Sequence, residues 1–96
     1  MPTIEEHCKE SLLLFGKNFA RVHSWLDEFA GKHPYGMRHR KLRHHEAGIQ
    51  EVIVLFGIEA GPVARQHIES DLREEGWKPN DPFPKNEKDY IRIGFF

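Results

Sequence analysis

Apolar residues recur three or four positions apart in four segments of the chain, a spacing that places them on one face of an α-helix. The first segment spans residues 4–15. Thr3 and Glu6 form a capping box at its start, in which each side chain satisfies a free backbone donor, and Gly16 is placed to end the helix. The apolar positions of this predicted helix are Ile4, Cys8, Leu12 and Phe15.

The second segment predicts a helix over residues 19–30, with Asn18 as its N-cap and Gly31 directly after it. Pro34 disfavours helix in the residue before it, so residues 32–36 are predicted to form a connection. The apolar stripe of this helix consists of Phe19, Val22, Leu26 and Phe29, with Trp25 at its border.

The third helix is predicted to be long, over residues 37–56, and Gly57 is placed to end it. Its last five residues, VIVLF, are β-branched or otherwise apolar and would also suit a buried strand, but the longer periodic pattern favours a helix. His45 falls on the core face of this helix and His44 lies to one side of it. The shared face consists of Leu42, His45, Ile49, Val52 and Phe56.

The fourth helix is predicted over residues 62–75, because Pro62 suits a first helical turn and Gly76 suits a helix end. Its apolar face holds Ala64, Ile68 and Leu72. The sequence therefore predicts an all-α fold, a four-helix bundle-like single domain over residues 1–76.

The remaining segment, residues 77–96, contains three prolines and is predicted to form an extended C-terminal tail. It ends in DYIRIGFF, whose β-branched and aromatic residues favour one short strand. A lone strand has no partner inside a helical bundle. We therefore expect the tail to pack across the helices or to pair with a second subunit, as in a homodimer.

Composition indicates one ordinary globular domain. The chain has 96 residues, of which 39% are hydrophobic, enough for one modest core without metal or disulfide support. No apolar run approaches the roughly 20 residues that cross a bilayer, and the acidic start does not resemble a signal peptide. We therefore expect a cytoplasmic protein without a membrane partner. Cys8 is the single cysteine, which excludes an internal disulfide and zinc sites built on cysteine pairs.

Positive charge is concentrated in residues 32–45, which contain no acid, although the whole chain has a net charge of −1. This asymmetry indicates an anionic partner, nucleic acid or an acidic protein, with a salt-dependent affinity. The alternatives are a solvated helix start, or a role for Arg40 and Arg43 in orienting carboxylates of an interior site. The candidate contact residues are Arg38, Arg40, Lys41 and Arg43, with Lys32 nearby.

Histidine is the most unusual component, with seven in the chain. His23 and Asp27, and His67 and Asp71, are each four residues apart, so each pair shares a helix face. Such pairs favour a metal site in the interior of a bundle, but they also suit a half-buried imidazole hydrogen bonded to a carboxylate. Both interpretations stay open.

Further histidines would complete such a site. His7 borders the first helix's stripe, and His44 or His45 would contribute from the third helix, since adjacent helical positions diverge by about 100°. His39 also falls on that helix, whereas His33 is predicted at the surface. The candidate metal ligands are His7, His23, Asp27, His44, His45, His67 and Asp71.

The predicted donor set suits zinc, iron, nickel or manganese, and a bound ion with an open position would activate water for hydrolysis. Familiar catalytic motifs are absent from the sequence, including HExxH, a glycine-rich phosphate loop, GxSxG and an adjacent His-Asp pair. No motif in the sequence therefore indicates a particular reaction.

Four segments, EHCKES, HSWLDE, RHRKLRHHEAGI and RQHIESDL, resemble in this order a family of small bacterial and bacteriophage proteins classed as a domain of unknown function. The resemblance spans residues 6 to 79 and implies a cytosolic protein without an assigned activity. The chain departs from the family pattern in a shorter connection at residues 57–62 and in its tail. The recurring pattern falls on His7, His23, Asp27, Arg38, His39, Arg40, Arg43, His44, His45, His67 and Asp71.

Overall fold

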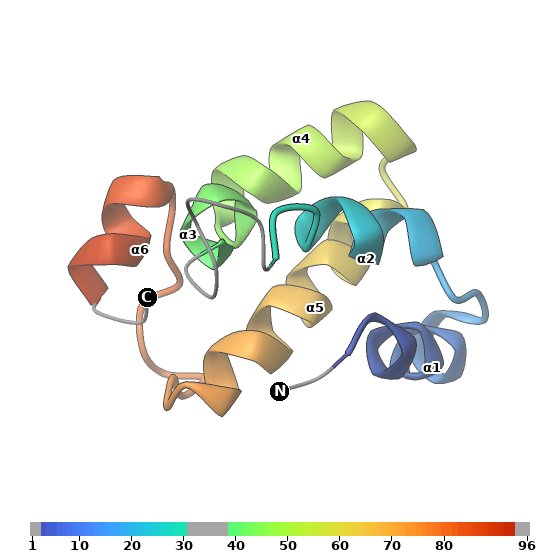
Figure 1. Cartoon of the computed structure of the whole chain (residues 1–96), viewed down its shortest axis with the longest axis horizontal. Coiled ribbons are helices and arrows are strands. Elements are labelled where there is room, and N and C mark those ends of the chain that lie inside the picture. The colour runs from blue at the N-terminus through green and yellow to red at the C-terminus, as the bar shows by residue number, and fades with distance from the viewer. Residues whose placement is uncertain (1–2, 31–38, 94–96) are drawn as a thin grey trace.

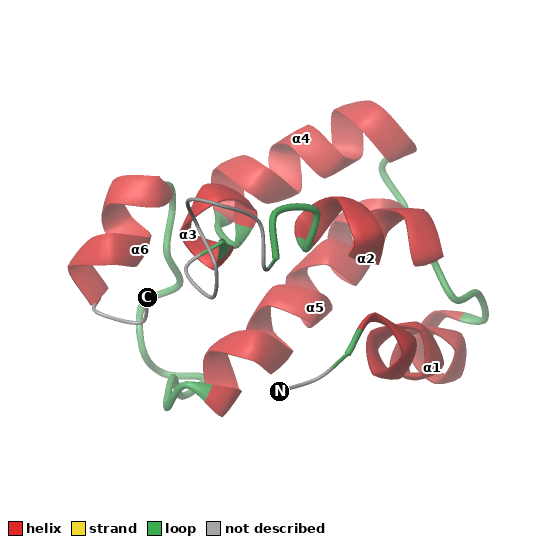
Figure 2. Cartoon of the chain, in the orientation of Figure 1, coloured by secondary structure: helices red, strands yellow, loops and turns green. Residues whose placement is uncertain are grey.

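A computed structural model describes residues 3–30 and 39–93, and over these ranges the chain is all-helical, with no strand (Figure 2). α5 crosses the middle of the molecule, with α4 and α2 on one side and α1 near its lower edge (Figure 1). No helix within these ranges is long and apolar enough to span a membrane. The helices are α1 (Ile4–Phe15), α2 (Ala20–Leu26), α3 (Arg40–Arg43), α4 (Glu46–Phe56), α5 (Ala60–Glu74) and α6 (Glu87–Ile93).

The core is organised around α5, which contacts α1, α2 and α4. Its predicted apolar face is confirmed, since Ala64, Ile68 and Leu72 are fully buried. Burial of this surface is the main favourable contribution to folding. The core comprises Val22, Leu26, Ile49, Val52, Ala60, Val63, Ala64, Ile68, Leu72, Trp77 and Tyr90.

The predicted bounds of α1 are confirmed, and the Thr3 hydroxyl accepts a hydrogen bond from the backbone N–H of Glu6 at 3.1 Å. Its predicted apolar face is wrong. His7 and Ser11 are buried against the other helices, whereas the side chain of Leu12 is largely exposed. The reason is that the interior opposite α1 is polar, so an imidazole and a hydroxyl find hydrogen-bonding partners there that a leucine could not supply.

The predicted second helix is shortened at its C-terminal end, where residues 27–30 form turns after Leu26. The predicted N-cap is wrong by one residue, because Phe19 is the N-cap and has a left-handed backbone with φ 51°. Asn18 still supports the helix start, since its Oδ1 accepts from the backbone N–H of Ala20 at 3.1 Å. Asp27 is the C-cap residue of α2, so it follows the helix that carries His23 and does not lie on it.

The prediction of one helix over residues 37–56 is wrong, because the chain turns at His44 and His45 and separates α3 from α4. The close approach of two backbone segments accounts for the turn. A Cβ atom at Gly48 would lie 1.9 Å from the carbonyl oxygen of Arg43, so only glycine fits there. His45 becomes the N-cap of α4, and its Nδ1 accepts from the backbone N–H of Gly48 at 3.0 Å.

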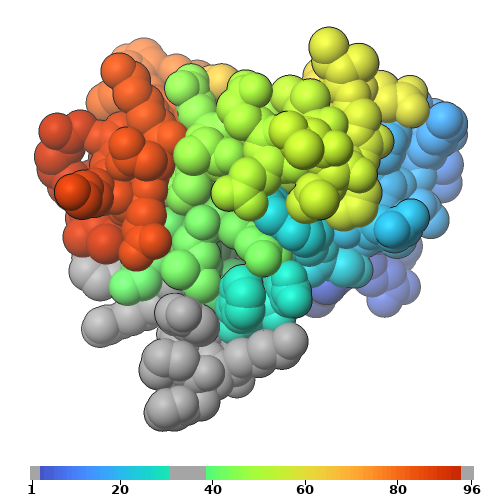
Figure 3. Space-filling view, turned by 90° about the horizontal axis from the view of Figure 1, so that it is seen from above, coloured from blue at the N-terminus to red at the C-terminus, as the bar shows by residue number. Residues whose placement is uncertain are grey.

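The prediction of an extended tail is wrong in part, because the residues expected to form a strand form α6 as far as Ile93. Asn86 caps this helix by accepting from the backbone N–H of Asp89 at 2.9 Å. Its Tyr90 is buried in the core of the same chain. In Figure 3, α6 lies beside α3 and α4 on one face of the molecule. Residues 94–96 lie outside the described ranges.

The segment before α6 also supports the start of α4. The first backbone N–H groups of a helix have no partner within the helix. Here the N–H groups of Glu46 and Ala47 donate to the carbonyl oxygens of Pro84 and Lys85, both at 3.0 Å. The tail therefore packs on its own helices. Pairing of the tail with a second subunit stays a prediction.

Candidate metal centre

Histidine and aspartate side chains from five parts of the chain meet in the interior where α1, α2 and α5 pack together. All are buried except Asp27, whose side chain is 12% exposed. α1, α2 and α5 supply four of the members, and the turns that flank α2 and α3 supply the others. We call this group the His/Asp cluster, and its members are His7, His23, Asp27, His39, His44, His67 and Asp71.

One carboxylate oxygen, Oδ1 of Asp27, faces three imidazole rings at once. It lies 3.3 Å from Nε2 of His39, 3.3 Å from Nε2 of His67 and 3.5 Å from Nε2 of His44. The three rings come from different parts of the chain, since His39 precedes α3, His44 follows it and His67 lies on α5. Asp27 therefore connects the imidazole of α5 with the two imidazoles that flank α3.

The second carboxylate, that of Asp71, divides its oxygens between different imidazoles. Oδ2 lies 2.8 Å from Nε2 of His44 and 3.3 Å from Nε2 of His67. Oδ1 lies 3.3 Å from Nε2 of His7. Because His67 and Asp71 are one turn apart on the buried face of α5, the helix itself sets their mutual position.

Two further imidazoles surround His67. The ring of His7 stacks on it with centroids 3.7 Å apart, and Nδ1 of His23 lies 2.8 Å from Nδ1 of His67. Nε2 of His23 in turn lies 2.6 Å from the hydroxyl oxygen of Ser11. A hydrogen-bonded line therefore runs from His67 through His23 to α1.

A buried arginine, Arg40, also contacts Asp71. Nη2 of Arg40 lies 3.4 Å from Oδ1 of Asp71, and its Nη1 lies 3.0 Å from Oε1 of Glu75. The hydroxyl of Tyr90 donates to Oε2 of Glu75 at 2.9 Å. An arginine in this position orients a cluster carboxylate and connects the cluster to α6.

Burial and mutual contacts set the charges of the cluster. Burial, together with the neighbouring His67 and His7, lowers the pKa of His23 to about 3, and burial lowers the pKa of His44 to about 4. Burial alone would raise the pKa values of Asp27 and Asp71, but hydrogen bonds with the surrounding imidazoles lower both. Burial alone would lower the pKa of His67, but hydrogen bonds with Asp27 and Asp71 raise it. Neutral imidazoles beside ionised carboxylates are the forms that bind metal ions, so metal binding at His67 would displace a proton.

Several buried polar atoms of the cluster have no hydrogen-bond partner among the described residues. They include Nε2 of His7, Oδ1 of Asp71, and Nδ1 of both His39 and His44. Such atoms are rare in folded proteins and indicate that an ion or ordered water belongs at the site.

Donor atoms of the cluster are close enough together to share one ion. One donor atom from each of His7, Asp27, His67 and Asp71 can be chosen so that all four lie within 4.8 Å of one another. The trio of His7, His23 and His67 also meets this criterion. We call the first set the metal quartet.

The sequence pattern of one protein family matches residues 3–81, which include the whole His/Asp cluster. This chain belongs to DUF6915, a domain of unknown function. No curated protein and no solved structure matches the chain. Membership of DUF6915 therefore supplies no activity, and function has to be argued from the cluster itself.

Six of the seven predicted metal ligands lie in the cluster, and His45 does not. The sequence pattern placed His45 on the core face and His44 to one side of it, but the structure buries both, His44 inside the cluster and His45 outside it. The helix that the pattern assumed is interrupted at these two residues. As a result His44 faces the carboxylates, whereas a ring nitrogen of His45 caps α4.

The predicted anion-binding residues are mostly engaged within the chain. Arg40 is buried against Asp71, so its guanidinium is not presented to a phosphate at the surface. Nη1 of Arg43 lies 2.6 Å from Oε1 of Glu28 and donates to the carbonyl oxygen of Trp25. Lys41 is half-buried. Lys32, His33 and Arg38 lie outside the described residues.

His39 belongs to the cluster and Ser11 contacts it, although neither residue is among the predicted ligands. His39 is part of the sequence pattern that resembles the family, but the predicted helix over residues 37–56 did not indicate that it would face Asp27. Ser11 lies four residues after His7, a spacing that places both on one face of α1. That spacing was the available signal.

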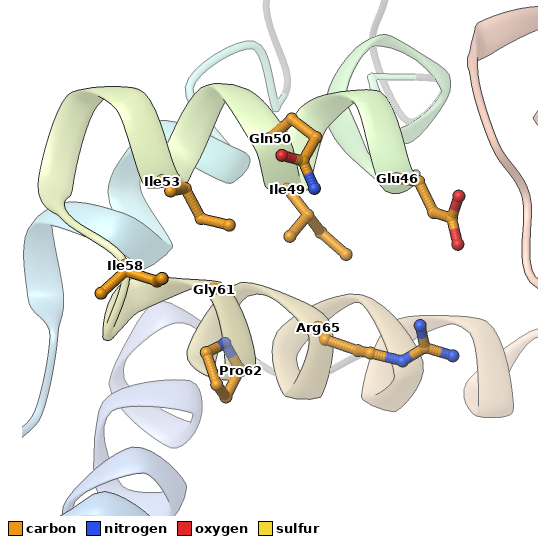
Figure 4. Close-up of a pocket in the computed structure, with 8 residues that line it drawn as sticks. All are labelled: Glu46, Ile49, Gln50, Ile53, Ile58, Gly61, Pro62 and Arg65. Carbon is orange, nitrogen blue, oxygen red and sulfur yellow. The ribbon is translucent and has the colours of Figure 1, made fainter.

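A groove lies elsewhere, between α4 and α5 (Figure 4). Ile49, Ile53 and Ile58 give it an apolar surface, and Glu46 and Arg65 lie at one end of it. None of its lining residues belongs to the His/Asp cluster. The groove is therefore a separate surface feature.

Proposed function

We propose that this protein binds a divalent transition-metal ion, zinc, iron, nickel or manganese, through the metal quartet. The observation that carries the proposal is that donor atoms of two carboxylates and two imidazoles, of which only Asp27 is partly exposed, lie within 4.8 Å of one another. A tetrahedral ion with bonds of about 2.0–2.1 Å holds its donor atoms about 3.3 Å apart. Nε2 of His67 lies 3.3 Å from Oδ1 of Asp27 and 3.3 Å from Oδ2 of Asp71. Nε2 of His7 lies 3.3 Å from the other oxygen of Asp71, Oδ1.

The quartet is a better ligand set than the histidine trio. The trio includes the contact between Nδ1 of His23 and Nδ1 of His67, which is short enough to be a hydrogen bond at 2.8 Å. The other ring nitrogen of His23, Nε2, lies 2.6 Å from the hydroxyl of Ser11, so both nitrogens of His23 are already engaged by neutral partners. The quartet also supplies two negative charges, which offset the charge of a divalent ion in a buried site.

The neighbours of His67 suit a metal-binding imidazole. Metal-binding histidines usually donate the other ring N–H to a fixed acceptor, which sets the tautomer and the ring orientation. Nδ1–H of His67 would donate to Nδ1 of His23, and Nε2–H of His23 would then donate to the hydroxyl of Ser11 at 2.6 Å. We therefore assign His23 the role of a positioning residue.

Metal analysis tests the proposal. Protein purified without a histidine tag would be stripped with EDTA, loaded separately with Zn²⁺, Mn²⁺, Ni²⁺ or anaerobic Fe²⁺, and desalted before its metal content is measured. We expect at least one of these ions to be retained at about one or more per chain, and to raise the melting temperature by about 5 °C or more in excess metal. EDTA should reverse the shift.

Two asparagine variants give a matched comparison. Asp27→Asn keeps the shape of a quartet ligand but removes its charge, so metal retention should fall at least tenfold. His45→Asn removes a histidine outside the cluster and keeps an N-cap for α4, so retention should be unchanged. Failure of the wild type to retain any of the four ions, with unchanged melting, would overturn the proposal.

We further propose that the bound ion activates water for hydrolysis. The quartet fills the four positions of a tetrahedral ion, so this step requires an ion that takes water as a fifth ligand, whose pKa it would lower to about 7. Solvent reaches the quartet at Asp27, the partly exposed member. Loaded protein should hydrolyse p-nitrophenyl acetate or p-nitrophenyl phosphate, Asp27→Asn should lose at least tenfold in rate, and His45→Asn should retain it. A rate equal to that of the free metal ion would contradict the hydrolytic step and leave metal binding standing.

A further inference from the structure

The His/Asp cluster contains more donor groups than one ion of this class uses. A structural zinc ion takes four ligands, and catalytic sites take three from the protein. The metal quartet already provides four. His39 and His44 are also buried, and each directs its Nε2 atom at a carboxylate of the quartet.

The two carboxylates lie between two pairs of imidazoles. Oδ1 of Asp27 is 3.3 Å from Nε2 of His67 and also 3.3 Å from Nε2 of His39. Asp71 contacts His7 through Oδ1 and His44 through Oδ2, at 3.3 and 2.8 Å. Asp27 also contacts His44, and Asp71 also contacts His67. Each carboxylate therefore contacts at least one imidazole of the quartet and at least one outside it, as a bridging ligand would.

The second pair of imidazoles is held by the turn structure around α3. His39 directly precedes this short helix and His44 directly follows it, so both rings reach the same carboxylates. Their planes are nearly perpendicular, with centroids 5.9 Å apart, so the rings converge without stacking on one another. Nδ1 of each ring has no hydrogen-bond partner among the described residues.

We infer that the cluster binds two divalent transition-metal ions, with His7 and His67 on one, His39 and His44 on the other, and Asp27 and Asp71 shared between them. The inference rests on the metal binding proposed above and adds a second site. Paired ions about 3.5–4 Å apart are a recurring arrangement in hydrolytic proteins. Each ion then has two imidazoles and two carboxylates as protein ligands.

Stoichiometry tests the second site. Stripped protein would be titrated with Mn²⁺ and with Zn²⁺, and the ions retained per chain would be measured for wild type, His39→Gln and the control His45→Asn. We expect about two ions in wild type and in the control, and about one in His39→Gln. Retention of one ion by wild type would overturn the second site but leave the quartet proposal intact, whereas retention of none would overturn both. Two ions in folded His39→Gln would overturn the ligand assignment.

A measurement on the wild type covers the case in which His39→Gln does not fold. Two Mn²⁺ ions bridged by carboxylates are magnetically coupled, so the fully loaded protein should give a coupled EPR spectrum that reverts to the hyperfine pattern of an isolated ion at low loading. The isolated-ion pattern at every loading would overturn the paired site.

Discussion

Gly48→Ala is expected to lower the free energy of unfolding by about 3 kcal/mol or more. In an ordinary helix this substitution stabilises, since alanine is favoured over glycine by about 1 kcal/mol. Here the new Cβ would lie 1.9 Å from the carbonyl oxygen of Arg43 and 2.7 Å from its carbonyl carbon. Both atoms are backbone, so the turn between α3 and α4 has to open. Urea unfolding followed by circular dichroism measures the loss.

Gly61→Ala is the matched control for this effect. A Cβ at Gly61 would meet only the end of the Ile53 side chain, at 3.0 Å, and that side chain can move. We expect a change of about 1 kcal/mol or less. Equal stability of Gly48→Ala and wild type would show that the carbonyl of Arg43 does not approach α4 as described. Because His44 lies in the same turn, Gly48→Ala should also weaken metal retention.

Asp71→Ala is expected to cost about 3–5 kcal/mol in metal-free protein, because it leaves the buried guanidinium of Arg40 without its nearest interior carboxylate. His7, His44 and His67 lose a carboxylate contact in the same change. The measurement is urea unfolding in the presence of EDTA, which separates this stability effect from metal binding.

Glu69→Ala is the control on the same helix. Glu69 pairs with Arg65 and Arg73, whose side chains are about half exposed, and such surface pairs contribute about 1 kcal/mol or less. A loss below about 1 kcal/mol for Asp71→Ala would mean that Arg40 is satisfied by Glu75 alone. If the expected loss is observed, replacing Arg40 and Asp71 together by apolar residues should recover most of it, because the unpaired buried charge is removed.

Helices with a local start signal and an apolar face were predictable from the sequence. α1 begins after Thr3, and α5 is buried along the face that holds Ile68 and Leu72. The histidine and aspartate pairs that singled out a candidate site also do meet in the interior. Each of these features depends on residues within a few positions of one another, which a periodic pattern captures.

The predictions that are wrong concern features that depend on contacts between distant segments. The break at His44 and His45 follows from the packing of Gly48 on the carbonyl of Arg43, which no spacing rule signals. The buried polar face of α1 follows from what lies opposite it, since Ser11 meets His23 of α2. The members of the His/Asp cluster come from five parts of the chain, so their arrangement is likewise fixed only when those parts pack together.

Protein shortened to the residues that match DUF6915 would lose two hydrogen bonds at the first turn of α4. That stretch ends at residue 81, before the carbonyls of Pro84 and Lys85 that accept from Glu46 and Ala47. A shortened polypeptide would leave those amide groups to solvent, one residue away from the bend that holds His44. Protein cut at residue 81 would therefore hold His44 less firmly, and the metal-retention measurements proposed above belong on protein that includes residues 82–93.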